Sequence, residues 1–173
     1  VYKKAIQQLV CEHLIASNRR SKRRKVNFKY EFTPDDLIRA LKNGEFTLFY
    51  QPQYRLSDSK LTSCEALIRW RHPNLGIVGP GEFIEIAEQN GIIGQITNYV
   101  LSEAARQEKI WRQKGVFLPI SINISAENIT SLSLPEYLVK LLDDNMINSD
   151  MITLELTEGA IVEELGCALD TLT

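Results

Sequence analysis

Residues 63–70 carry charged side chains inside a stretch that is otherwise apolar enough to be a buried strand. Because side chains alternate along a strand, Glu65, Leu67 and Arg69 should share one face. The opposite face then holds Cys64, Ala66, Ile68 and Trp70. A buried carboxylate is costly unless it is paired or bound to a metal. The rest of the chain must therefore supply a partner for Glu65.

Three further segments alternate in the same way, and each carries a polar group opposite its apolar residues. These groups are Gln51 in residues 46–54, Asn123 in residues 117–125 and Glu155 in residues 151–157. Two carboxylates and an amide oxygen that converge on one face make an all-oxygen ligand set, which suits Mg²⁺ or Mn²⁺. Arg69, on the face of Glu65, is suited to hold a phosphate through paired hydrogen bonds.

The same residues also allow simpler interpretations. Glu65 or Glu155 could form an internal ion pair with Arg69, because structural networks also bury carboxylates. Asn123 could be a strand amide bonded to backbone, and Gln51 could meet only water or backbone groups. The pattern of residue types does not choose between these alternatives.

Helices should separate and position these strands. Thr33 and Pro34 give the start of a helix, and Asn43-Gly44 gives its end. Further helices are predicted at 82–89, 94–114 and 134–144, with an unfinished one from residue 161, and residues 72–81 read as a loop. From the second strand onward the order is β-α-β-α-β, which implies parallel strands with helices outside. In a β/α barrel, sites lie on the inward side near the carboxyl ends of the strands.

The composition is ordinary for a soluble globular protein. The 173 residues are 44% hydrophobic and 24% charged. Three widely spaced cysteines indicate reduced thiols, and two isolated histidines argue against a histidine-based zinc site. The chain has no apolar run of about 18 residues and no signal-peptide pattern, so we expect a cytoplasmic location, which would also fit the cytoplasmic portion of an inner-membrane protein.

Charge is divided unevenly along the chain. Residues 1–32 hold nine Lys/Arg and two acidic side chains, and the remainder holds 11 basic and 20 acidic ones. The basic run at 19–25 is interpreted as a linker. The alternatives are a segment beside an upstream membrane or sensor domain and a patch that binds nucleic acid. We expect 1–32 to be a linker or helix from an upstream region, with no nucleic-acid partner. The globular unit is 33–173. Because the chain begins at Val1 and stops within a predicted helix, we expect a fragment.

Five segments match the motifs of one known family in order and spacing. They are Tyr50-Gln51-Pro52; Glu65-Ala66-Leu67-Ile68-Arg69-Trp70 with His72-Pro73; Gly79-Pro80-Gly81-Glu82-Phe83-Ile84 with Ala87-Glu88; Ser121-Ile122-Asn123-Ile124-Ser125; and Glu155-Leu156-Thr157-Glu158. Together they resemble the EAL domain, the cyclic-di-GMP phosphodiesterase barrel of bacterial signalling. The resemblance covers residues 33–173 and leaves out 1–32.

The resemblance implies a TIM-type (β/α) barrel that hydrolyses cyclic-di-GMP to linear pGpG with Mg²⁺ or Mn²⁺. It implies that Glu65, Asn123 and Glu155 are metal ligands, with Glu65 also a catalytic residue. Gln51, Leu67 and Arg69 would contact the dinucleotide. Glu158 would hold a loop that links metal binding to homodimer formation through the EAL domain.

The resemblance also predicts what this chain lacks. The family's Asp-Asp pair and its later Lys, Glu and Gln positions would fall beyond Thr173. A complete barrel needs about 250 residues, so we expect only about the first half of one, inactive by itself. One alternative is an inactive EAL module that serves as a cyclic-di-GMP receptor or protein-interaction regulator. Another is a short interaction protein in its own right.

Overall fold

The computed structural model describes residues 30–129 and 133–156. The predictions for the basic segment up to residue 29, for Glu158 and for the final helix lie outside these residues. The elements, in order, are α2 (Pro34–Lys42), β1 (Phe46–Arg55), β2 (Lys60–His72), β3 (Gly76–Val78), η1 (Pro80–Glu82), α3 (Ile84–Gln89), α4 (Ile93–Gln113), β4 (Ile120–Ile124), α5 (Ala126–Ile129), α6 (Ser133–Asn145), η2 (Ser149–Met151) and β5 (Ile152–Leu156).

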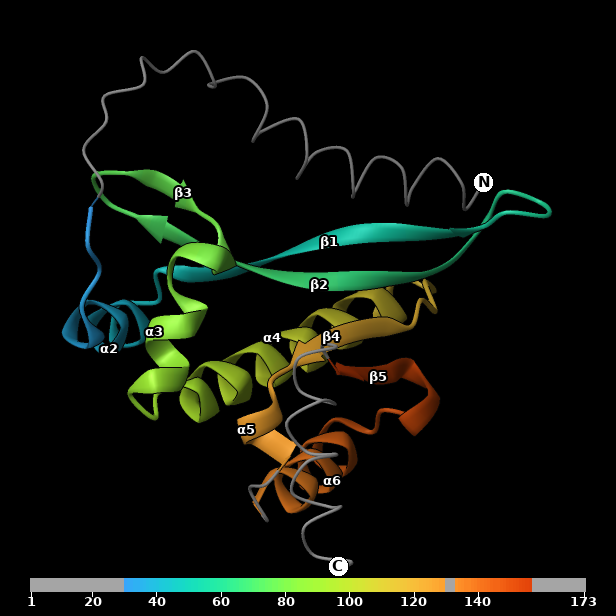
Figure 1. Cartoon of the computed structure of the whole chain (residues 1–173). Helices are drawn as coiled ribbons and strands as arrows, with labels where there is room; N and C mark the ends of the chain where they lie inside the picture. Colours follow the sequence, from blue (N-terminus) through green and yellow to red (C-terminus); the bar gives the residue numbers. More distant parts are fainter. Residues whose placement is uncertain (1–29, 130–132, 157–173) are drawn as a thin grey trace, which may run out of the picture.

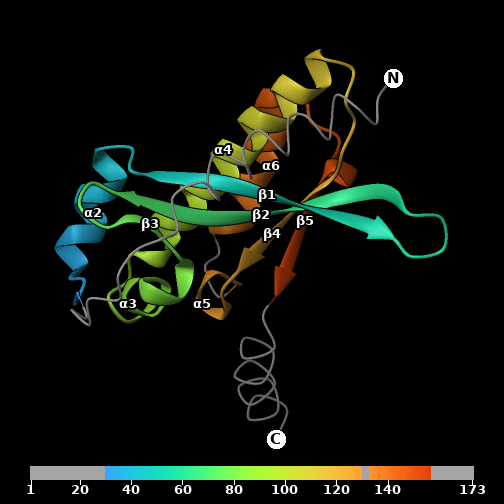
Figure 2. The same ribbon diagram turned by 90° about the horizontal axis from the view of Figure 1, so that it is seen from above.

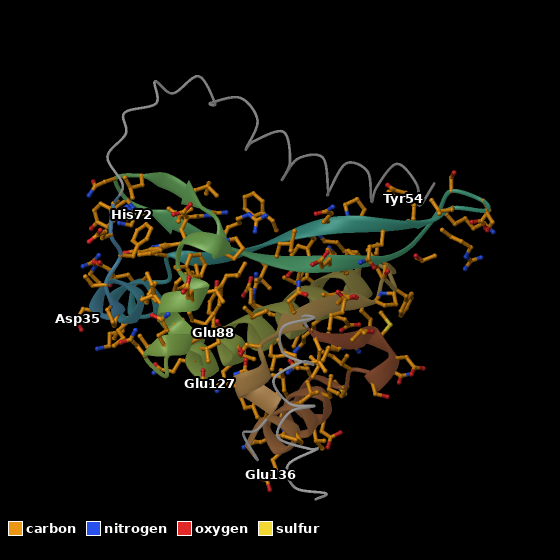
Figure 3. The ribbon with its side chains drawn as sticks, in the orientation of Figure 1. Asp35, Tyr54, His72, Glu88, Glu127 and Glu136 are labelled. Carbon is orange, nitrogen blue, oxygen red and sulfur yellow. The ribbon has the colours of Figure 1, made fainter. Side chains whose placement is uncertain are left out.

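One mixed sheet organises the fold, with strand order β1-β2-β4-β5 and β3 paired to β2. β1 and β2 form an antiparallel hairpin, while β2, β4 and β5 run parallel, as the β-α-β-α-β order predicts. Helix α4 packs against the sheet and α6 packs against α4 (Figure 1). The hairpin projects well past β4 and β5 (Figure 2), and its outer part carries Tyr54 (Figure 3) and the fully exposed Leu56.

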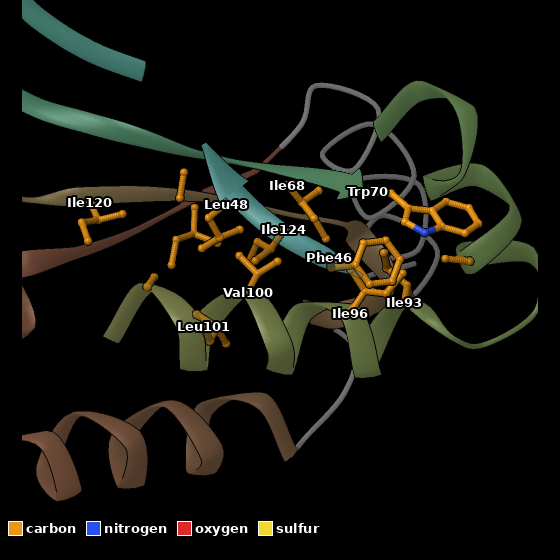
Figure 4. Close-up of a cluster of buried hydrophobic side chains, with 14 of the residues drawn as sticks. Phe46, Leu48, Ile68, Trp70, Ile93, Ile96, Val100, Leu101, Ile120 and Ile124 are labelled. Carbon is orange, nitrogen blue, oxygen red and sulfur yellow. The ribbon is translucent and has the colours of Figure 1, made fainter. Parts of the chain in front are cut away.

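The apolar face of the sheet meets α4 and forms the core. Cys64, Ala66, Ile68 and Trp70 on β2 are all 9% exposed or less, which confirms the predicted alternation. They pack with side chains of β1, β4 and α4, among them Leu48, Ile124 and Val100 (Figure 4). Burial raises the pKa of the Cys64 thiol to about 12, so this cysteine stays a neutral core residue.

Helix α2 begins as the sequence predicts. The Thr33 side chain accepts a hydrogen bond from the Asp36 backbone N–H, and the Asp36 carboxylate accepts one from the Thr33 N–H, which completes a capping box. Arg39 also pairs with Asp36 at 2.6 Å. Burial alone would raise the pKa of Asp36, but the hydrogen bonds from Thr33 and Arg39 outweigh it and hold this pKa below its usual value.

The sequence prediction is wrong in three local details. The segment read as a loop contains β3, which folds back onto the end of β2 around His72, whose Nδ1 accepts hydrogen bonds from Asn74 and Leu75. A three-residue strand is too short to show alternation. β4 begins at Ile120 and not at Phe117, because Pro119 has no N–H to give to a ladder. The four-residue helix α5 was also missed.

No helix within residues 30–129 or 133–156 combines the length and apolar character that crossing a membrane requires.

Candidate active site

A row of polar side chains crosses the face of the sheet that points away from α4. Gln51 on β1 lies opposite Glu65 on β2, and Asn123 on β4 lies opposite Glu155 on β5. Glu65 is in register with Ser121, so Asn123 lies one pleat further along the neighbouring strand. The fold therefore brings together residues that are far apart in the sequence, in adjacent strands of one sheet.

Glu65 and Asn123 touch directly. The Asn123 Nδ2 donates a hydrogen bond of 2.6 Å to the Glu65 Oε1. Within the described parts of the chain, the other carboxylate oxygen of Glu65 and the amide oxygen of Asn123 have no further hydrogen-bond partner. Asn123 is thus not bonded to backbone there, and two oxygens remain available on this face.

Arg69 forms no ion pair with Glu65, Glu155 or any other described carboxylate. Its Nη1 instead donates to the Ile68 carbonyl at 2.8 Å, and its Cζ lies 5.8 Å from the centroid of the Phe49 ring. The internal ion pair, one of the two interpretations of Glu65, is therefore absent in these segments. The guanidinium keeps donors for an anion.

The polar row borders a cavity. β2 and β4 pair only over Cys64–Ala66, and where they separate a cavity of about 470 Å³ opens towards α3 and α4. Its lining is mostly aliphatic. It includes Asn123 from the row, Leu67 from β2, Gly81 from η1, Ile84 and Glu88 from α3 (Glu88 is labelled in Figure 3), and Ile96 from α4.

A small buried network fixes the chain just after Asn123. The Thr97 hydroxyl on α4 and the Ser125 hydroxyl both donate to the Asn128 Oδ1, at 2.8 and 3.0 Å. Thr97 and Asn128 are each 5% exposed. Sequence reasoning missed this network, because nothing in the local pattern connects a helix threonine with an asparagine 31 residues later. It also gave no role to Phe49, which alternation along β1 puts on the face of Gln51.

The donor chemistry of the row fits a hard divalent cation. Glu65, Asn123 and Glu155 offer carboxylate and amide oxygens, the donors that Mg²⁺ and Mn²⁺ prefer. Among the described residues, no three or more His, Cys, Asp and Glu side chains lie together as a metal site. The row itself has only two carboxylates, and its third oxygen donor is an amide. A full coordination sphere would need water or additional protein ligands.

Comparison with known proteins decides the family, since the EAL domain matches residues 35–173. The chain belongs to the EAL domain family. Its sheet and helices resemble those of a solved EAL protein, described as "PaMucR Phosphodiesterase, c-di-GMP complex", with a TM-score of 0.72 and 32% identity over 78% of this chain and 55% of that one.

Curated proteins of two bacteria are also similar to this chain in sequence. It is 36% identical over 130 residues to "Signaling protein YkoW" of Bacillus subtilis (strain 168), covering 75% of this chain and 16% of YkoW. It is 32% identical over 145 residues to "Cyclic di-GMP phosphodiesterase PdeR" of Escherichia coli (strain K12), covering 84% of this chain and 22% of PdeR. The chain thus spans a minor part of these relatives.

Proposed function

We propose that this EAL domain hydrolyses cyclic-di-GMP to linear pGpG with the help of Mg²⁺ or Mn²⁺. One observation carries the proposal: Glu65 and Asn123 meet on the polar face of the sheet, with Glu155 beside Asn123, and within residues 30–129 and 133–156 Arg69 forms no ion pair with a carboxylate. The phosphodiesterase name of PdeR and the ligand in the PaMucR complex support the choice of substrate.

Each residue of the row takes a part in this reaction. Glu65, Asn123 and Glu155 would hold the metal, which supplies Lewis-acid polarisation of a phosphoryl oxygen. The hydrogen bond from Asn123 fixes the orientation of the Glu65 carboxylate. Arg69 binds a phosphate oxygen through its remaining N–H groups. Gln51 and Leu67, on the same face, contact the dinucleotide beside that phosphate.

The cavity provides a place for one base of the dinucleotide. Leu67 and Asn123 are among its lining residues, and its walls are mostly aliphatic. A planar aromatic base gains from leaving water for such walls. Cyclic-di-GMP would then lie with a phosphate over Arg69 and Glu65 and a base in the cavity.

The proposal extends to the whole domain. The sheet would form about the first half of a TIM-type barrel, with the family's Asp-Asp pair and its later Lys, Glu and Gln beyond Thr173. That the chain spans 55% of the PaMucR chain supports this division. Glu158 would hold the loop that couples the metal site to homodimer formation. The domain would follow a linker in residues 1–32 and lie in the cytoplasm.

A second function, that of a receptor which binds cyclic-di-GMP without turnover, rests on Arg69. Its guanidinium contacts the Ile68 carbonyl and the Phe49 ring, and it pairs with no carboxylate in residues 30–129 and 133–156. A site short of metal ligands would still bind a phosphate through Arg69.

The test is to incubate the full-length protein with cyclic-di-GMP and Mg²⁺ or Mn²⁺ and to separate the nucleotides by chromatography. We expect linear pGpG with either metal and none in EDTA. Binding without product would favour the receptor. Absence of both binding and product would reject the proposal.

A further inference from the structure

Phe49 is a large apolar side chain on the polar side of the sheet. Alternation along β1 puts it with Gln51, opposite Leu48, which is 4% exposed in the core. Phe49 is half-buried, yet among the described residues it is not part of the hydrophobic core or of the side chains packed against it. Its cross-strand partner is Leu67, on the same polar side. Core packing therefore does not explain this ring.

The ring of Phe49 contacts the guanidinium of Arg69. The 5.8 Å from the Arg69 Cζ to the ring centroid lies within the range of a cation–π interaction. Arg69 is opposite Thr47, so it meets Phe49 as a diagonal neighbour across the hairpin. The hydrogen bond from Arg69 to the Ile68 carbonyl holds the guanidinium from another side. Two contacts, neither of them with an anion, thus fix its position.

We propose that Phe49 is a positioning residue, which holds the Arg69 guanidinium ready for a phosphate of the dinucleotide. The inference rests on the function proposed above. A carboxylate could hold the guanidinium equally well, but it would compete with the phosphate for the same N–H donors. A ring orients the cation and leaves those donors free. Ordering the long side chain before binding reduces the entropy lost when the phosphate arrives.

Phe49→Leu removes the ring and keeps an apolar side chain. We expect the affinity of the full-length protein for cyclic-di-GMP, measured by calorimetry in EDTA, to fall about three- to five-fold. In steady-state kinetics the change should lie in KM, with kcat little altered. Phe49→Tyr keeps the ring and should restore most of the affinity. Phe117→Leu, at a 69% exposed phenylalanine just before β4, is the matched control and should have no effect.

A double-mutant cycle separates positioning from direct contact with the ligand. In an Arg69→Ala background, Phe49→Leu should cause no further loss of affinity, because the side chain that it positions is gone. The same three- to five-fold loss in both backgrounds would overturn the proposal, since the ring would then act on the ligand or on the fold.

A second readout does not depend on ligand binding. The Nε–H resonance of Arg69 in the ligand-free full-length protein should shift in Phe49→Leu through loss of the ring current, and should return in Phe49→Tyr. An unchanged resonance in Phe49→Leu would overturn the positioning role. If the wild-type protein neither binds nor cleaves cyclic-di-GMP but the resonance shifts, the contact stands and the function proposed for the site fails.

Discussion

The two faces of β4 differ in burial, since one packs in the core and the other carries a residue of the proposed site. Ile120, Ile122 and Ile124 are 0, 0 and 6% exposed and lie in the core. Asn123, between the last two, is exposed and contacts Glu65 on the neighbouring strand. Adjacent residues therefore have different tasks: the isoleucines hold the sheet on α4, and the asparagine has no part in that packing. Substitutions on the two faces should accordingly change different measured quantities.

The largest effect on stability should come from the core face. Ile122→Ala removes three carbons from a side chain that is 0% exposed. We expect the free energy of unfolding to fall by about 2–5 kcal/mol, from lost burial and the cavity left behind. Denaturant unfolding of the full-length protein followed by circular dichroism measures this, and Ile122→Val should cost only about 0.5–1.5 kcal/mol. A negligible loss of unfolding free energy in Ile122→Ala would contradict the core role of this face.

The neighbouring position should show the opposite behaviour. Asn123→Ala removes an exposed amide and its hydrogen bond to Glu65, so the free energy of unfolding should change by less than about 0.5 kcal/mol. Cyclic-di-GMP hydrolysis should fall by about 10- to 100-fold, as when the groups around a metal are removed. Asn98→Ala, at an exposed position of α4, is the matched control and should retain full activity. Equal activity of the two variants would contradict the role given to Asn123.

The cavity offers a milder test of the ligand-binding side. Gly81 lines it, and a Cβ added at Gly81 would meet no atom within 4 Å. Gly81→Leu should therefore fold normally but occupy space needed by the base, and we expect affinity for cyclic-di-GMP to fall about ten-fold, or about 1.4 kcal/mol. Gly79→Leu, two residues earlier and also free of clashes, should bind normally. Unchanged affinity in Gly81→Leu would place the base elsewhere.

The smallest expected effect lies at the start of α2, away from the polar row. Because the pKa of Asp36 is held below its usual value, its carboxylate stabilises the fold at neutral pH, and this contribution is lost as pH falls below about 4 through the lowered pKa. Asp36→Asn should cost about 1 kcal/mol at pH 7 and progressively less in acid. Unfolding measured from pH 7 to pH 2 tests this. A cost independent of pH would reject the assignment, and activity should not change.

Much of this arrangement follows from the sequence, because alternation and capping are local rules. Glu65 and Arg69 could be assigned to the polar face from residue types alone, and the α2 cap from Thr33 and Pro34. The contact of Asn123 with Glu65 depends on strand order and register, which the chain sets through non-local packing. The Phe49–Arg69 contact and the hydrogen bonds to Asn128 could not be predicted for the same reason. β3 could not be predicted, since only its pairing with β2 defines it.

The central claim, that the polar face of the sheet binds a divalent metal, is tested most directly by Mn²⁺ binding. The electron paramagnetic resonance signal of free Mn²⁺ should decrease when full-length wild-type protein is added. Glu65→Gln should bind markedly less, whereas Glu85→Gln, at an exposed carboxylate on α3, should bind as the wild type does. Mn²⁺ binding that is equal in all three proteins would contradict a metal site at Glu65.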